Sequence, residues 1–128
     1  MEQHINKLKD SSIDYLIELA RSEQVHADIK TPDKFVRGCK NYIWVSTDPQ
    51  SDNTFKFRFA SSSYISLGMC LILGSHLNGL TATQISQVKF SDLKKFTVYL
   101  PLERQRGVQA VLNKIHQEVK LPIDKSSV

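Results

Sequence analysis

The sequence is short of the residues and motifs that mark several common protein classes. Its 128 residues include only two cysteines, Cys39 and Cys70, and no Cys-x-x-Cys pair. A disulfide framework and a dithiol redox site are therefore both unexpected, and a reducing compartment, the cytoplasm, is the predicted location. The four histidines are scattered and show no metal-ligand spacing, so we expect no metal site.

Catalytic motifs and long apolar runs are lacking too. The sequence contains no glycine-rich phosphate loop, HExxH or GxSxG pattern, and nothing local supports a Cys-His-Asp protease. Residues 60–88 carry no charge, but only residues 69–73 are wholly apolar, whereas a spanning helix needs about 20 such residues. The sequence starts with an acid and without the apolar core of a signal peptide. We expect no membrane association.

The remaining composition is that of an ordinary globular domain. Hydrophobic residues make up 41% and charged residues 23% of the chain, and the net charge of +4 is a mild excess. The length suits one domain with a real hydrophobic core. We predict a single domain over residues 1–128, with its core at about 8–120 and a flexible tail at 121–128.

An antiparallel hairpin is predicted near the middle of the chain. Phe55, Phe57 and Phe59 alternate with polar residues, which is typical of a strand with one face on the core. A second strand is predicted over residues 42–46, and the turn-forming residues 48–53 join the two.

Helices are predicted on both sides of this hairpin. Their capping residues and apolar spacing place them from Ser11 to about 21–24, at 64–77, from the capping box at Thr81, and from Pro101 to just before Pro122. The predicted fold class is therefore α+β, with a small antiparallel sheet packed against several helices in two layers.

A loop that leads into the first strand is the best candidate for chemistry. Cys39 follows Gly38, whose backbone freedom allows a sulfur to be presented at a tight turn. Arg37 and Lys40 flank it, and positive charge favours the nucleophilic thiolate. The plainer alternative is a small buried thiol. Cys70 lies in the apolar run 69–73, so it is interpreted as an inert core residue.

The second unusual stretch precedes the last predicted helix. Arg104, Arg106 and Gly107 cluster at a helix start, where the helix dipole disfavours cations. Either these side chains form a solvated first turn, or an arginine faces an anion or a partner protein.

Taken in order along the chain, several of these motifs resemble the SufE family, the sulfur-acceptor proteins of iron–sulfur cluster assembly. The resemblance covers about residues 8–119. It rests on Tyr15-Leu16-Ile17-Glu18-Leu19, Gly38-Cys39-x-x-x-Ile43-Trp44, Asn78-Gly79-x-Thr81 and Arg104-x-x-Gly107-Val108.

The resemblance implies a fold similar to the IscU-type scaffold and a role for Cys39 as sulfur acceptor. The donor would be a PLP-dependent cysteine desulfurase of the SufS type, which the protein would stimulate, and the recipient a scaffold complex similar to SufBCD. Arg37, Gly38, Lys40 and Trp44 would support the cysteine loop. Arg104 matches the family's arginine before the last helix, so Arg104 and Gly107 are predicted to face a partner or an anion.

The implied carrier would need no cofactor of its own and would be a monomer or weak homodimer. Its thiol is expected to be shielded at rest beneath Val36, Ile43 and Trp44, with Gly38 as the hinge of an opening loop.

Four positions depart from the family pattern. Asn41 stands where a serine is usual, Phe35 replaces an asparagine, Ser62 replaces an aspartate and Tyr99 replaces a histidine. These changes leave the cysteine intact and bear on which desulfurase is the partner.

Two other functions remain open on the sequence. One is a nucleic-acid-binding module with Lys89, Lys94, Lys95, Arg104 and Arg106 as phosphate contacts, although the interleaved aromatic residues expected for single strands are missing and no nucleic-acid partner is predicted. The other is a desulfurase activator that does not use Cys39.

Overall fold

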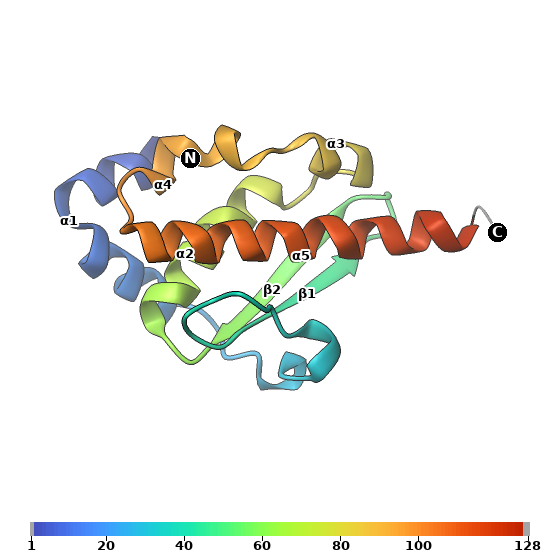
Figure 1. Cartoon of the computed structure of the whole chain (residues 1–128), viewed down its shortest axis with the longest axis horizontal. Helices are drawn as coiled ribbons and strands as arrows, with labels where there is room; N and C mark the ends of the chain where they lie inside the picture. Colours follow the sequence, from blue (N-terminus) through green and yellow to red (C-terminus); the bar gives the residue numbers. More distant parts are fainter. Residues whose placement is uncertain (1, 127–128) are drawn as a thin grey trace.

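The computed structural model describes the backbone of residues 2–126 and the side chains of residues 2–120. Within these residues the chain forms one two-stranded antiparallel sheet and five α-helices, which confirms the α+β class (Figure 1). The helices are α1 (Glu2–Arg21), α2 (Tyr64–Leu77), α3 (Ala82–Gln87), α4 (Lys94–Thr97) and α5 (Leu102–Ser126). Short 3₁₀ turns lie at Ala27–Ile29, Pro32–Lys34 and Phe90–Leu93.

The sheet is the predicted hairpin, made of β1 (Ile43–Pro49) and β2 (Phe55–Ser61). Strand β1 is longer than predicted, because Asp48 and Pro49, which were expected in the turn, pair with Lys56 and Phe55. Val45 pairs with Phe59 and Thr47 with Phe57, so the phenylalanines of β2 share one face with the odd-numbered residues of β1. The three phenylalanines on that face are buried, as the alternation in the sequence predicts.

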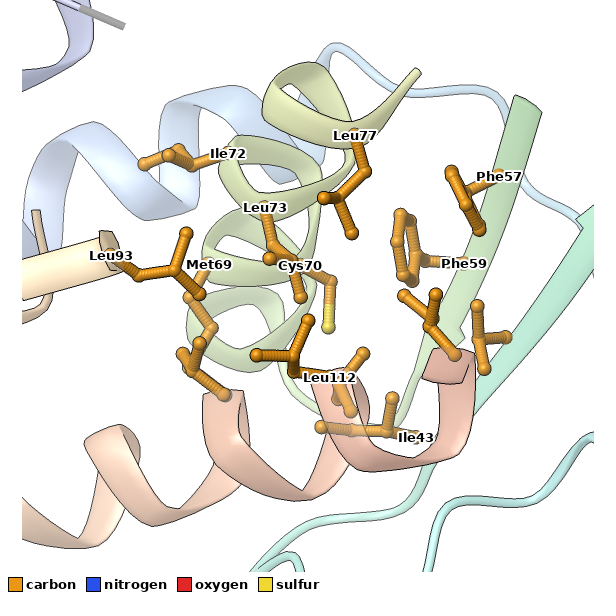
Figure 2. Close-up of a cluster of buried hydrophobic side chains, with 14 of the residues drawn as sticks. Ile43, Phe57, Phe59, Met69, Cys70, Ile72, Leu73, Leu77, Leu93 and Leu112 are labelled. Carbon is orange, nitrogen blue, oxygen red and sulfur yellow. The ribbon is translucent and has the colours of Figure 1, made fainter. Parts of the chain in front are cut away.

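Helices α2 and α5 cover the buried face of the sheet. In Figure 1, α2 lies along β2 and α5 crosses in front, while α1 packs on the side of α2 away from the sheet. The side chains between them form one hydrophobic cluster that includes Phe59, Leu73 and Leu112 (Figure 2). Cys70 points into this cluster and is 1% exposed, in agreement with its interpretation as a core residue.

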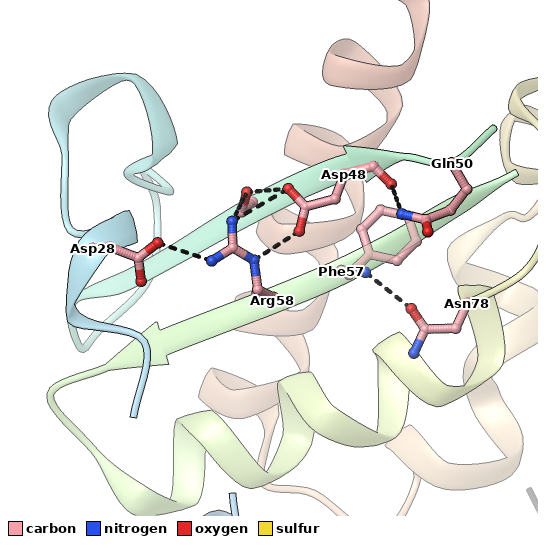
Figure 3. A network of polar contacts seen from close by, with 7 residues as sticks. Asp28, Asp48, Gln50, Phe57, Arg58 and Asn78 are labelled. Atoms are coloured by element: carbon pink, nitrogen blue, oxygen red, sulfur yellow. Dashed lines mark hydrogen bonds and ion pairs between the residues drawn. The ribbon is translucent and has the colours of Figure 1, made fainter. Parts of the chain in front are cut away.

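The opposite face of the sheet carries a polar network instead. Arg58 Nε donates to Asp48 at 2.7 Å, and its Nη1 donates to Asp28 at 2.9 Å (Figure 3). Burial works against ionisation of Asp48, but hydrogen bonds from Arg58 and Ser46 outweigh it and hold the pKa of this carboxyl below its usual value. The network thereby ties the segment before β1 to the sheet.

The central helix, α2, was predicted correctly, because the residues that flank it carry clear start and stop signals. Ser63 caps α2 by accepting from the Ser66 backbone N–H, and Gly79 follows the helix with a positive φ of 84°. The capping box at Thr81 and Gln84 is also present. Each of these capping contacts joins residues within one helical turn, so the helix ends could be predicted from the local sequence.

Both ends of the chain differ from the prediction. Helix α1 begins at Glu2, and Ser11 marks a kink within it (φ −162°, ψ 89°) where a helix start was expected. Residues 2–10 carry few apolar side chains, but Leu8 is 2% exposed and packs in the core. Helix α5 continues past Pro122 to Ser126, whereas the prediction ended this helix just before the proline. The backbone of residues 121–126 is thus helical where a flexible tail was predicted, and residues 127–128 of that predicted tail lie outside the described residues.

The turn Pro32–Lys34 leads directly into Phe35. Phe35 then leaves the turn and forms a bridge with Trp44. This bridge places the following loop against the start of β1.

Helices α1 and α2 approach most closely at Gly68. A Cβ atom placed on Gly68 would lie 2.2 Å from the Leu16 carbonyl oxygen, so any side chain here separates the two helices. We expect Gly68→Ala to lower the free energy of unfolding by about 1–3 kcal/mol, the usual cost of overpacking. Chemical denaturation measures it, with Ser75→Ala, an exposed position on the same helix, as the control. Equal stability of both variants would contradict the close approach.

Candidate functional site

Residues 37–42 form a loop that is closed at its base by the edge of the sheet. The Val36 N–H donates to the Ile43 carbonyl at 2.9 Å, beside the bridge between Phe35 and Trp44. Gly38 adopts a positive φ of 92°, a backbone conformation that residues other than glycine rarely adopt. The predicted turn before the cysteine is therefore present.

Cys39 is half-buried between this loop and α5. Its Sγ lies 3.8 Å from the Gly107 carbonyl oxygen, and its side chain packs on the edge of the core cluster. Burial raises the pKa of the Cys39 thiol to about 11. The expectation of a thiolate favoured by neighbouring cations is therefore wrong for this conformation, in which the sulfur is a protonated thiol at neutral pH.

The two flanking cations point elsewhere. Lys40 Nζ pairs with Glu103 on α5 at 3.3 Å, so its charge is partly neutralised. Arg37 is exposed and lines a groove of about 560 Å³ between the loop and α5. The groove is lined by Pro32, Asp33, Phe35, Arg37, Gly38, Arg106, Gln109, Ala110, Asn113, Lys114 and Gln117. Although Arg37 and Lys40 are close to Cys39 in the sequence, neither positive charge is paired with the thiol.

Arg104 turns inward rather than into solvent. Its Nη1 donates to the Ser66 hydroxyl on α2 at 2.9 Å, and Asn41 of the cysteine loop donates to the same oxygen at 3.2 Å. Sequence reasoning missed Ser66. The only signal was a polar side chain at a position of α2 that faces the core, where it is 1% exposed.

Gly107 does not face outward and Trp44 does not cover the thiol, although the bridge from Trp44 to Phe35 does support the base of the cysteine loop. Gly107 is buried, with the methyl carbon of Met69 2.8 Å from where its Cβ would lie, so the residue packs against α2 and does not face a partner. Trp44 lies on the outer face of the sheet, where Lys30 Nζ is 5.6 Å from its ring centroid. Alternation along β1 explains this, since Ile43 faces the core and its neighbour cannot. The Cys39 side chain is shielded instead by its packing against the edge of the hydrophobic core.

The other departures from the family pattern have structural roles. Phe35 packs edge-on against Tyr42 and Trp44, with ring centroids 5.8 and 5.7 Å away. The Ser62 hydroxyl accepts from the Tyr42 backbone N–H at 3.1 Å and so fixes the end of the loop. Tyr99 packs partly buried against the core cluster.

Three of the five cations proposed for nucleic-acid binding, Lys95, Arg104 and Arg106, lie in different surroundings. Arg104 is bonded to Ser66, and Arg106 lies in the groove beside Arg37. Lys95 lines a separate hollow with Lys9 of α1. Among the side chains described, no group of three or more histidine, cysteine or acidic residues is arranged to hold a metal ion. None of the described helices is long and apolar enough to cross a membrane.

Comparison with known proteins identifies a matching family. The profile described as "SufE: Fe-S metabolism associated domain" matches residues 2–119. An uncharacterized SufE-like protein of Haemophilus influenzae is 29% identical over 87 residues, covering 66% of this chain and 67% of that protein. Two chloroplastic quinolinate synthases of Nicotiana tabacum are 34% and 38% identical over 73 and 74 residues. Those matches cover 56% of this chain but only 10% of each plant protein.

The raised pKa of Cys39 has a direct consequence for its reactivity. Only the thiolate is alkylated, so we expect the rate of Cys39 alkylation by iodoacetamide in the free protein to keep rising with pH up to about 11. At pH 7.5 the rate should be roughly 100-fold or more below that of an unfolded peptide with an ordinary cysteine pKa. Peptide mapping follows Cys39 and Cys70 separately. A plateau near pH 8.5 would contradict the buried thiol.

Proposed function

The chain belongs to the SufE family and so has a role in iron–sulfur metabolism, and we propose that it carries sulfur on Cys39. The sulfur comes from a PLP-dependent cysteine desulfurase of the SufS type, which the protein stimulates. A scaffold complex similar to SufBCD receives it, in the cytoplasm. The observation that carries this proposal is the contrast between the two thiols: Cys39 lies on a loop at the molecular edge, whereas Cys70 is enclosed in the core.

The chemical step needs no redox partner. The Cys39 sulfur attacks the outer sulfur of the persulfide on the desulfurase cysteine. A new S–S bond forms on Cys39 while the S–S bond on the desulfurase breaks, and the electron pair of the broken bond stays on the desulfurase cysteine. That cysteine takes up the proton lost by Cys39, so atoms, charge and electrons balance.

The resting geometry requires the loop to move before this step. Beside Gly107 the thiol is half-buried and protonated, which protects it from oxidation but also from sulfur transfer. Movement outward removes the desolvation that raises the pKa of the Cys39 thiol. Gly38 is the hinge, because glycine changes backbone angles at low cost.

Arg104 has a second role in this proposal. It starts the last helix close to the cysteine loop, bonded to Ser66. When a partner offers an anion, the guanidinium can exchange a neutral hydroxyl for a charged acceptor, which forms the stronger hydrogen bond. Arg104 thus faces the partner in the docked complex although it is turned inward at rest.

The proposal does not extend to the activity named for the plant relatives. The chain spans about one tenth of the length of the quinolinate synthases that it matches. The similarity is confined to 73 and 74 residues, and the synthase activity belongs to those proteins alone.

Incubation with a cysteine desulfurase and free cysteine tests the proposal. Peptide mapping should find an added sulfur on Cys39 and none on Cys70, because burial leaves Cys70 inaccessible. Cys39→Ser should abolish loading, and Arg104→Ala should weaken desulfurase stimulation more than Arg106→Ala, which removes an equal charge from the same helix.

Two results would overturn this assignment. Sulfur found equally on Cys70 would remove the special role of Cys39. Full desulfurase stimulation by Cys39→Ser, without any sulfur on wild-type Cys39, would show an activator and not a carrier.

A further inference from the structure

Ser66 is an unusual residue for its position. It lies in the first turns of α2, on the side that packs into the protein, and it is 1% exposed. A buried hydroxyl is costly unless it is hydrogen-bonded. Here its oxygen accepts two hydrogen bonds from side chains of two different elements, as its two lone pairs allow.

The two donors connect the parts of the site that the chemistry needs. Asn41 Nδ2 lies 3.2 Å from Ser66 Oγ and belongs to the loop that carries Cys39. Arg104 Nη1 lies 2.9 Å from the same oxygen and belongs to the first turn of α5. One hydroxyl therefore contacts both the cysteine loop and the arginine beside it.

Few other polar contacts hold the middle of the loop against the helices. The Lys40–Glu103 pair is exposed on both sides, 59% and 50%, and such surface pairs contribute little. The contact from Cys39 Sγ to the Gly107 carbonyl is 3.8 Å long and uses a weak donor. The hydroxyls of Ser61 and Ser62 contact the loop at its base, through the backbone of Tyr42. The bond from Asn41 to Ser66 is thus the main polar tie of the loop to a buried group.

We propose that Ser66 is a positioning residue that latches the Cys39 loop in its shielded conformation through Asn41. Arg104 bonds to the same oxygen and so helps to fix the orientation of the Ser66 side chain. An anion that draws Arg104 outward removes this restraint, and Ser66 then holds Asn41 less firmly. Docking of an anionic partner group is thereby coupled to exposure of Cys39. The coupling rests on the proposed function, whereas the latch itself does not.

The latch is tested on the free protein by the rate of Cys39 alkylation with iodoacetamide, followed by peptide mapping. Ser66→Ala and Asn41→Ala should each raise this rate about two- to tenfold, the change expected when one hydrogen bond stops favouring the closed loop. Ser75→Ala removes a hydroxyl from the same helix far from the loop, and it should leave the rate unchanged.

A double-variant cycle separates a latch from a general loss of packing. If Asn41 acts through Ser66, the double variant should react no faster than Ser66→Ala alone, whereas independent effects would multiply. Asn41→Ala does not change any residue of α2. If Ser66→Ala proves unstable in thermal unfolding, the alkylation rate of Asn41→Ala therefore tests the latch. Wild-type rates in Asn41→Ala, or multiplied rates in the double variant, would overturn the latch.

Addition of a persulfide-free desulfurase tests the coupling. The wild-type alkylation rate should rise, and the further rise in Ser66→Ala should be smaller, since its loop is already partly open. An equal rise in both would overturn the coupling. Failure of sulfur loading on Cys39, with accelerated alkylation in Ser66→Ala, would remove the proposed function and leave the latch standing.

Discussion

Desolvation of the Cys39 thiol is the constraint on which the rest of the site depends. A sulfur acceptor must present a nucleophile, yet contact with α5 and the core edge raises the pKa of this thiol to about 11. The same burial protects the sulfur from oxidation. A protein that uses Cys39 for transfer therefore has to separate a stored state from a reactive state, and the loop of residues 37–42 is the element that can do so.

Two helices, the sheet and one loop are enough to provide both the stored and the reactive state of Cys39. Helices α2 and α5 bury the sheet, and their first turns lie on either side of the cysteine loop, as the contacts of Ser66 and Glu103 show. The base of the loop is fixed by the sheet and by Ser62, whereas its middle is held by side chains alone. A rigid base with a releasable middle allows the sulfur to move without disturbing the core.

Local signals in the sequence were enough for the hairpin, for α2 and for the turn at Gly38, because alternation, caps and a glycine act over a few residues. The electrostatics of Cys39 could not be predicted in this way. Its pKa depends on Gly107 and α5, which are distant in the sequence, and the adjacent Lys40 is drawn to Glu103. Ser66 and the outward Trp44 were missed for the same reason, since tertiary packing decides which face each residue occupies.

The most direct test of the account is the alkylation rate of wild-type Cys39, measured alone and with a saturating, persulfide-free cysteine desulfurase. The account predicts slow reaction in the free protein and at least about a tenfold acceleration on docking, as the pKa of the exposed thiol returns toward its ordinary value. Cys70, read from the same digests, should remain unmodified throughout. Fast alkylation of the free protein, or slower alkylation after the partner is added, would contradict a thiol that is stored at rest and released by docking.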